Sequence, residues 1–286
     1  MAAVHIVTDS SCDLTADEAE HLGVDIVPLS IRFGDKEFTD RVDLSVDEFY
    51  RRLNEAAELP ETAAPAPGAF EQVFRRAAEN GASAVVCVNL SSDLSATIQS
   101  AQNAARAVAD TIDVRVVDSH SITGGLGSQV IAAAESARDG VSADDIVAMV
   151  NDMAQRTHVL GALDTLENLK KGGRIGNAQA LLGNLLSIKP LIDVSTGKVE
   201  EAGKARTRKK ALRWLADRLL EVPVVERLSV CHGEAPDLDE FLEMLAPRFP
   251  RDEIRIALIG AVIGTHGGPR VMGVTWQEPT GAQRPD

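Results

Sequence analysis

Short apolar runs alternate with longer amphipathic segments along the first half of the chain. The runs at residues 4–7, 25–33, 84–90 and 114–117 have the length and β-branched content of strands. Between them, apolar positions recur every three or four residues and predict helices at residues 15–22, 44–57, 69–80, 95–109 and 122–137. This alternation is typical of a parallel sheet with helices on both faces.

The second half follows a different pattern. A helix is predicted at 143–157, and extended or apolar segments follow at 158–162 and 185–194, with a hairpin turn near 195–198. Helices at 207–220 and 238–246 and strands at 227–231, 254–260 and 271–276 complete the chain. Because a hairpin pairs strands antiparallel, the second half is expected to contain a mixed sheet. We place a boundary near residue 160, where the pattern changes, and expect an α/β protein of two domains. Residues 1–160 would form a three-layer α/β/α parallel sheet, and residues 161–286 a two-layer mixed sheet.

Composition narrows the classes of function. Hydrophobic residues make up 44% of the chain but aromatic residues only 3%, so the core must be aliphatic. A formal net charge of −14 opposes binding to nucleic acid and to anionic membranes. No apolar run approaches the ~20 residues of a membrane-spanning helix. We therefore expect a soluble, cytoplasmic protein with no stable membrane insertion.

The three cysteines, Cys12, Cys87 and Cys231, are far apart in the sequence and lack the spacing of a zinc site. We expect them to be reduced thiols, with Cys87 and Cys231 in the core. The sequence predicts no metal site and no cofactor.

Four segments place hydroxyls, glycines or a histidine where predicted strands end and helices begin. They are residues 8–11, the Pro-rich residues 59–65 around Thr62, residues 89–95 around Ser92, and residues 264–269 around His266. Ligands of open parallel sheets bind outside the carboxyl ends of the strands, where free helix N–H groups also attract anions. Each segment also has a plainer interpretation, respectively a turn, a stiff linker, a helix N-cap at Ser92 and a structural histidine.

Two cationic segments also have more than one interpretation. Residues 170–176, KKGGRIG, form either a solvated turn or a loop in which Arg174 binds a carboxylate with two parallel hydrogen bonds. Lys204, Arg206, Arg208 and Lys209 gather at the start of a predicted helix. They form either a solvated helix face or a docking patch for an acidic partner.

Several catalytic signatures are absent, namely GxxxxGK[ST], HExxH and GxSxG. A stand-alone phosphotransferase or hydrolase remains an alternative, with Asp9, Asp118 and His266 as its acid–base groups. Asp118 is followed by Ser119 and His120, but a triad depends on spatial geometry and not on adjacency. A regulatory module that senses a small acid is a further alternative.

Five motifs in order resemble those of the DegV family of fatty-acid-binding proteins. They are VTDSSCDL at 7–14, SSDLSATIQSA at 91–101, VDS at 117–119, LENLKKGGRIG at 166–176 and GTHGGP at 264–269. The resemblance implies two α/β domains and one long-chain fatty acid, whose carboxylate is held by Thr62, Ser92 and His266 with Arg174 nearby. Supporting residues would be Asp9, Ser10, Ser91, Ser95, Asp118, Ser119 and Gly267.

The resemblance also implies a partner. The chain would catalyse nothing alone and would present its fatty acid to a separate, DAK-type ATP-binding kinase subunit, which forms the acyl phosphate. Burying about 14 methylenes at about 0.8 kcal/mol each gives roughly 11 kcal/mol before association costs, so the tail alone can supply tight binding. Chain length, unsaturation, branching, oligomeric state and the choice between carrier and sensor do not follow from the sequence.

The chain departs from the family pattern in three places, one of which is Ala96 in place of the glycine of the family's LSGT. The loop that usually reads TSQPS in the family has Ala63, Ala64 and Ala66 here, so three polar side chains are missing. Arg270 replaces the last glycine of the closing motif. Because arginine does not readily adopt a positive φ, we expect this loop to differ, with an added cation near His266.

Overall fold

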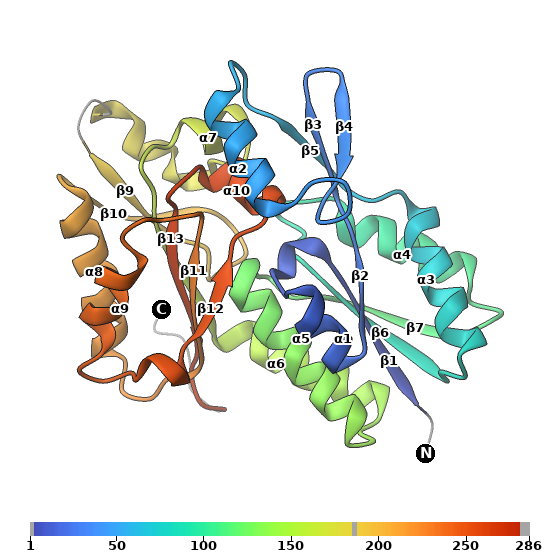
Figure 1. Ribbon diagram of the computed structural model, residues 1–286. Helices are drawn as coiled ribbons and strands as arrows, with labels where there is room; N and C mark the ends of the chain where they lie inside the picture. Colours follow the sequence, from blue (N-terminus) through green and yellow to red (C-terminus); the bar gives the residue numbers. More distant parts are fainter. Residues whose placement is uncertain (1–2, 185–187, 281–286) are drawn as a thin grey trace.

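The computed structural model describes residues 3–184 and 188–280 and contains a four-stranded parallel sheet in its N-terminal half (Figure 1). The strand order is β2-β1-β6-β7. These strands are β1 (Val4–Asp9), β2 (Val24–Val27), β6 (Ala84–Asn89) and β7 (Asp113–Asp118). Helices α3 (Pro67–Glu79) and α4 (Thr97–Ala107) cover one face, and α5 (Thr123–Arg138) and α6 (Ala143–Arg156) cover the other. The predicted parallel sheet with helices on both faces is confirmed.

A six-stranded mixed sheet, in the order β10-β9-β8-β13-β11-β12, forms the other half. Only β11 and β12 pair in parallel; the other neighbours are antiparallel. The strands are β8 (Thr157–Ala162), β9 (Lys189–Asp193), β10 (Glu200–Ala205), β11 (Glu226–His232), β12 (Arg255–Leu258) and β13 (Met272–Gln277). Helices α8 (Arg208–Glu221) and α9 (Leu238–Leu245) cover its outer face. The predicted hairpin is the β9–β10 pair, whereas residues 185–187 of the predicted apolar run lie outside the described residues.

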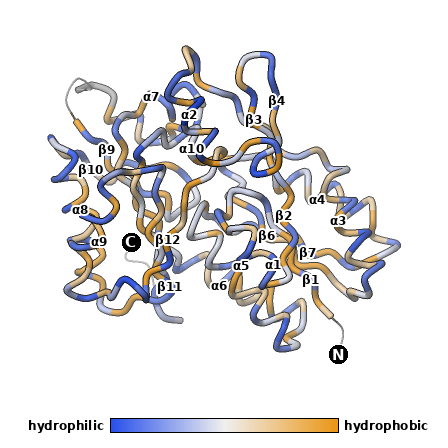
Figure 2. Tube along the Cα trace, viewed as in Figure 1, coloured by the Kyte–Doolittle hydropathy of each residue, from blue (hydrophilic) through white to orange (hydrophobic). Residues whose placement is uncertain are grey.

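Helix α5 lies between the two sheets and contacts both (Figure 1). Eleven of its 16 residues are buried, so it is an internal helix and not a surface one. Its Leu126 and Val130 share one core with Val86 of the first sheet and with Val159 and Ile192 of the second. Apolar residues concentrate along the strands on either side of it (Figure 2). The division of the chain near residue 160 stays a prediction, because the two halves share this core.

A small antiparallel sheet, β4-β3-β5, packs beside α2 (Val46–Glu55) and α10 (Ala261–Gly267). Its strands are β3 (Ser30–Phe33), β4 (Lys36–Thr39) and β5 (Glu61–Ala63). Two predictions are corrected here. Residues 25–33 form two strands in different sheets, separated at Pro28, which has no N–H for a ladder. The segment predicted as a loop around Thr62 contains β5, which pairs with β3.

The starts of α1 and α4 differ in whether the capping residue expected from the sequence is present. Thr15 and Glu18 form a capping box at the start of α1 (Ala16–Leu22), as their spacing predicts. Ser92 is not an N-cap: α4 begins at Thr97, and the preceding Ala96 makes no side-chain cap bond. The remaining elements are α7 (Glu167–Lys171) and the 3₁₀ helices η1 (Ser10–Cys12), η2 (Gly176–Asn184) and η3 (Arg251–Glu253).

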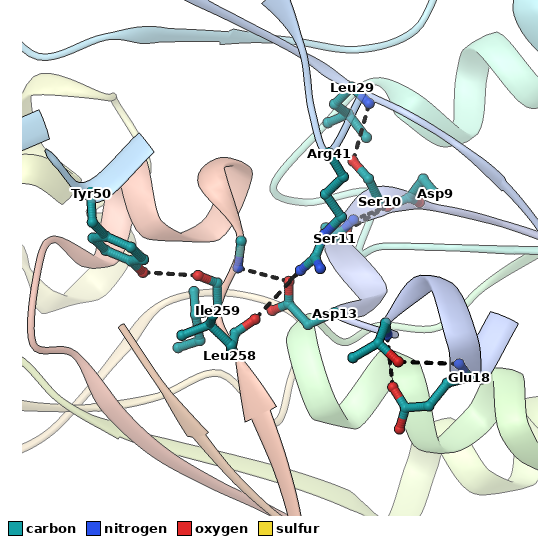
Figure 3. Close-up of polar contacts among 12 residues, drawn as sticks. Asp9, Ser10, Ser11, Asp13, Glu18, Leu29, Arg41, Tyr50, Leu258 and Ile259 are labelled. Atoms are coloured by element: carbon teal, nitrogen blue, oxygen red, sulfur yellow. Dashed lines mark hydrogen bonds and ion pairs between the residues drawn. The ribbon is translucent and has the colours of Figure 1, made fainter. Parts of the chain in front are cut away.

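A buried carboxylate joins the two halves (Figure 3). Asp13 is 2% exposed, and its Oδ1 accepts hydrogen bonds from Arg41 Nη2 at 2.8 Å and from the backbone N–H of Gly260 at 2.9 Å. Burial raises the pKa of the Asp13 carboxyl, and the Arg41 charge opposes that rise. Nearby, Tyr50 donates its hydroxyl to the carbonyl of Ile259 at 3.0 Å. The start of α10 is therefore fixed against the first sheet.

Replacing Arg41 with Met should destabilise the fold, because the buried Asp13 carboxylate loses its cation. We expect the free energy of unfolding to fall by about 3–5 kcal/mol in urea denaturation. Arg51→Met is the matched control: Arg51 pairs with Glu48 and Glu55 on an exposed helix face, and little change is expected. Equal effects of the two substitutions would refute the role of Arg41.

Candidate ligand-binding site

An apolar cavity opens between the two sheets beside α5 and α10. Its volume is about 170 Å³. That is more than tenfold the ~10–15 Å³ needed for one water. Aliphatic side chains dominate its wall, among them Leu90, Leu163, Leu169, Ile192, Val199 and Ile263. A mainly aliphatic cavity of this size suits an apolar ligand.

One end of this cavity has polar side chains from four separate elements and loops. Thr62 lies on β5, Ser95 precedes α4, Arg174 follows α7 and His266 lies on α10. Thr62 Oγ1 and His266 Nε2 are 3.1 Å apart. We call these four residues the mouth, because two more polar clefts adjoin the cavity at Arg174.

The imidazole ring of His266 is closely packed. Its Nδ1 is buried and has no hydrogen-bond partner among the described residues. Gly172 leaves room for the ring, since a Cβ there would stand 2.3 Å from Nδ1. Burial and, secondarily, the Arg174 charge lower the pKa of His266 to about 4, so the imidazole is neutral at pH 7. His266 was predicted in a strand-end loop; it lies instead in the last turn of a helix.

Two backbone carbonyls orient Arg174. Its Nε donates to the carbonyl of Leu94 at 3.1 Å, and its Nη1 donates to the carbonyl of Gly172 at 2.8 Å. Both partners are uncharged, so the guanidinium keeps its full positive charge at the mouth. This arrangement provides a cation for an anionic group and leaves other guanidinium N–H groups to bond it.

The two serines at either end of the 92–95 segment lie differently with respect to the cavity, and the role predicted for Ser92 stays a prediction. Ser92 is exposed and does not line the cavity; its backbone N–H donates to the Asp118 carboxylate at 3.2 Å. Ser95 lines the cavity instead, with its Oγ 2.9 Å from Thr97 Oγ1. The turn between β6 and α4 separates these two residues, and the sequence does not predict which of them faces inward.

Most of the predicted supporting residues hold the strand-end loops together and do not line the cavity. Asp9 is fully buried and accepts hydrogen bonds from Ser11, from the Asn89 side chain and from the N–H of Leu90. Burial raises its pKa, which these hydrogen bonds oppose. Ser91 donates to the Gly197 carbonyl at 2.7 Å, which joins the turn after β6 to the β9–β10 hairpin. Among the supporting residues, Ser95 and Gly267 line the cavity, whereas Asp9, Ser10, Ser91, Asp118 and Ser119 do not.

The predicted docking patch loses one member. Arg208 forms a bidentate ion pair with Asp237 at 2.8 and 2.9 Å, and its side chain is only 13% exposed. It therefore fixes the start of α8 near α9 and is not free for a partner. Lys204, Arg206 and Lys209 are exposed, and Lys209 Nζ lies 3.5 Å from a carboxylate oxygen of Glu240.

The departures from the family motifs have clear local consequences. Ala63 and Ala64 line the cavity, and Ala66 occupies the N-cap of α3 without a side-chain bond. Arg270 does adopt a positive φ, 61°, contrary to the expectation that it would avoid one. Its Nε lies 3.5 Å from Asp164 Oδ2, an ion pair beside the strained backbone. The added cation of Arg270 therefore pairs with the Asp164 carboxylate.

Sequence reasoning also missed cavity residues on the strands of the second sheet. Val159 of β8, Cys231 of β11 and Thr275 of β13 line the wall. All three cysteines are free, and Cys87 and Cys231 are buried as expected; Cys12 is buried as well. Strand alternation within 271–276 was the available signal, since it places Gly273 and Thr275 on one face.

Within 3–184 and 188–280, no group of three or more His, Cys, Asp or Glu residues is placed to hold a metal ion. In the same part of the chain, no helix is long and apolar enough to cross a membrane.

Residues 3–278 match the family model described as "Uncharacterised protein, DegV family". The chain belongs to the DegV family. A DegV domain-containing protein of Streptomyces coelicolor is 38% identical over 277 residues, covering 95% of this chain and 97% of the relative. One of Listeria innocua is 34% identical over 278 residues, covering 96% and 98%.

Solved structures of DegV proteins share the whole fold. A fatty-acid-binding DegV family protein from Thermus thermophilus superimposes with a TM-score of 0.88 at 32% identity, covering 97% of this chain and all of that one. DegV from Bacillus subtilis, a fatty acid binding protein, gives 0.87 at 28% identity, covering 98% and 100%. A stearic acid-binding protein from Eubacterium ventriosum gives 0.85 at 27% identity, covering 97% and 98%. The predicted DegV fold is confirmed.

Gly172→Ala should disturb the mouth of this DegV protein. The new Cβ would overlap His266 Nδ1, so either the ring or the α7 turn must move. We expect a loss of about 1–3 kcal/mol in the free energy of unfolding. Gly68→Ala in α3 is the control: a Cβ there meets nothing within 4 Å, and the substitution should be neutral or stabilising by up to ~1 kcal/mol. Equal effects of the two variants would contradict the close approach.

The depressed pKa of His266 predicts a pH dependence of stability. The unfolded chain binds this proton near its ordinary pKa of 6.5, whereas the folded protein binds it only near pH 4. The contribution of His266 to the free energy of unfolding is therefore complete above pH 6.5 and is lost as the pH falls towards 4. It amounts to about 3 kcal/mol. Urea denaturation between these pH values should show a steeper loss of stability for the parent protein than for His266→Gln. Parallel curves would contradict the assignment.

Proposed function

We propose that this protein binds one long-chain fatty acid, with the tail in the cavity and the carboxylate at the mouth. The observation that carries the proposal is the division of the cavity wall. Its body is aliphatic, while Thr62, Ser95, Arg174 and His266 form one polar end. A ligand complementary to this wall has a long apolar part and a single anionic group.

The tail and the carboxylate of the fatty acid contribute differently to the free energy of binding. Each methylene removed from water contributes about 0.8 kcal/mol, so the tail supplies most of the affinity. A carboxylate buried without partners would be prohibitively costly, and the Arg174 charge with the two hydroxyls meets that requirement. Neutral His266 can donate from one ring nitrogen. The mouth therefore fixes the direction in which the fatty acid lies.

The fatty acid binding of the Thermus and Bacillus proteins supports the ligand class. Both share the fold over nearly the whole chain, at 32% and 28% identity. In the carboxylate set we replace Ser92 of the sequence analysis with Ser95, because Ser95 lines the cavity and Ser92 does not.

We further propose that the protein catalyses nothing alone and presents the carboxylate to a separate, DAK-type ATP-binding kinase subunit. Two polar clefts adjoin the cavity at Arg174, and one of them includes Lys171. They leave the carboxylate within reach of a partner, whose bound ATP would supply the phosphoryl group while ADP leaves. Lys204, Arg206 and Lys209 remain a proposed docking surface, and a cytoplasmic location remains a prediction.

The arrangement of acidic residues supports the absence of independent catalysis. Asp9 and Asp118 do not line the cavity that contains His266. Asp9 is already occupied by four hydrogen bonds, and Asp118 accepts from the N–H groups of Ser92 and His120. The enzyme alternative needs these groups together at one substrate.

Native mass spectrometry of the purified protein, with extraction and identification of lipids, should show one fatty acid per chain. Ser95→Ala should weaken fatty acid affinity about 10- to 100-fold, because a hydrogen bond to a charged group is worth about 1.5–3 kcal/mol. Ser92→Ala, three residues away but outside the cavity, is the control and should bind as the parent does.

The same two variants test the kinase partnership. With the kinase subunit and ATP, acyl phosphate formation at low fatty acid concentration should fall for Ser95→Ala and not for Ser92→Ala. A protein that neither carries nor takes up fatty acid would refute the proposed function. Acyl phosphate formation by this chain without the kinase would refute its non-catalytic role.

A further inference from the structure

The cavity is not aliphatic throughout, because its wall along β13 ends in a hydroxyl. Val271, just before the strand, and Gly273 and Thr275 within it occupy alternate positions, and all three line the cavity. Val271 lies at the mouth end, where a Cβ on Gly267 would be 3.4 Å from its methyl groups. Thr275 is four residues further on, roughly 13 Å along an extended strand. Its hydroxyl therefore lies beside the distal part of any chain whose carboxylate is at the mouth.

The Thr275 hydroxyl is buried and unpartnered. The residue is 1% exposed, and Oγ1 has no hydrogen-bond partner among the described residues. The strand ladders on both sides occupy the backbone groups of β13 through pairs with β8 and β11. Since buried hydroxyls in folded proteins are nearly always hydrogen-bonded, an orphan hydroxyl facing a cavity indicates a partner that the cavity contents supply.

Polar groups from two other elements surround Thr275. A Cβ on Gly124 would stand 2.9 Å from Thr275 Oγ1 and 2.7 Å from the Sγ of Cys231, so these two groups are neighbours. Thr123 also lines the cavity, with φ at 45°, a region that β-branched residues rarely adopt. Its hydroxyl is also buried and has no hydrogen-bond partner among the described residues, although it is close enough to the Cys231 thiol and the Asp13 carboxyl to lower their pKa values. Thr275 is therefore one of two such hydroxyls on the cavity wall, and it is the one on β13.

We propose that the preferred ligand is a fatty acid with a hydroxyl group in the distal half of its chain, and that Thr275 determines this preference. The inference rests on the proposed function and specifies its substrate class. A hydroxyl buried against an aliphatic wall carries a desolvation penalty, whereas one placed at Thr275 gains a partner that both donates and accepts. A plain alkyl chain leaves Thr275 unpaired, and sites built around a hydrogen bond discriminate against ligands that lack it.

The test is a double-mutant cycle between protein and ligand. Delipidated parent protein and Thr275→Val, which has nearly the same shape without the hydroxyl, are titrated with stearate and with stearates hydroxylated at successive positions beyond mid-chain. For the best-matched isomer, the parent's preference over stearate should fall about tenfold in Thr275→Val. Stearate itself should bind the variant at least as tightly. Thr275→Ser should retain the preference even if Thr275→Val folds poorly.

Thr8→Val is the matched control. Thr8 is also buried with an unpartnered hydroxyl, but it does not line the cavity, so its removal should leave the ligand preference unchanged. If the parent binds stearate but no hydroxylated isomer gains from Thr275, the inference is wrong and the proposed function stands. If the parent binds no fatty acid of either kind, the proposed function itself fails.

Discussion

The hydrogen bonds around the Asp13 carboxylate are the constraint on which the site depends. Asp13 ends the first strand–turn unit of the N-terminal sheet, yet it accepts from the N–H of Gly260 at the start of α10. Arg41 compensates the buried charge and also reaches the Leu258 carbonyl at 3.4 Å (Figure 3). Because α10 carries His266 and packs beside the small sheet that carries Thr62, this junction determines where the mouth forms.

An acidic chain can hold an anion because the charge at the mouth is local. The net charge is −14, but Arg174 bonds to two carbonyl groups and to no carboxylate among the described residues. His266 next to it is neutral, because burial and the Arg174 charge both disfavour its protonated form. The mouth therefore combines one unneutralised cation with uncharged hydrogen-bonding groups. This balance leaves one positive charge at the mouth and avoids two adjacent cations.

The cavity exists because α5 packs against both sheets. A helix buried on most of its surface brings the two sheets into one core, and its start leaves a gap that neither sheet fills. Gly124 lets the start of α5 pack closely against Cys231 and Thr275, because a Cβ there would lie only 2.7 Å from Cys231 Sγ and 2.9 Å from Thr275 Oγ1. The deep wall is therefore built from three elements far apart in the sequence. The polarity of this wall depends on how the three elements pack together and not on any single motif.

The sequence by itself determined the α/β alternation, the hairpin, the capping box at Thr15 and the family motifs that mark Thr62, Arg174 and His266. These features depend on periodicity and on local spacing, which a linear pattern contains. Tertiary structure decided which of Ser92 and Ser95 faces the cavity, because the turn between β6 and α4 sets that direction. It also paired Arg208 with Asp237, held Arg270 at a positive φ and brought Thr275 to the cavity wall. Each of these outcomes depends on contacts between distant segments, which local sequence does not encode.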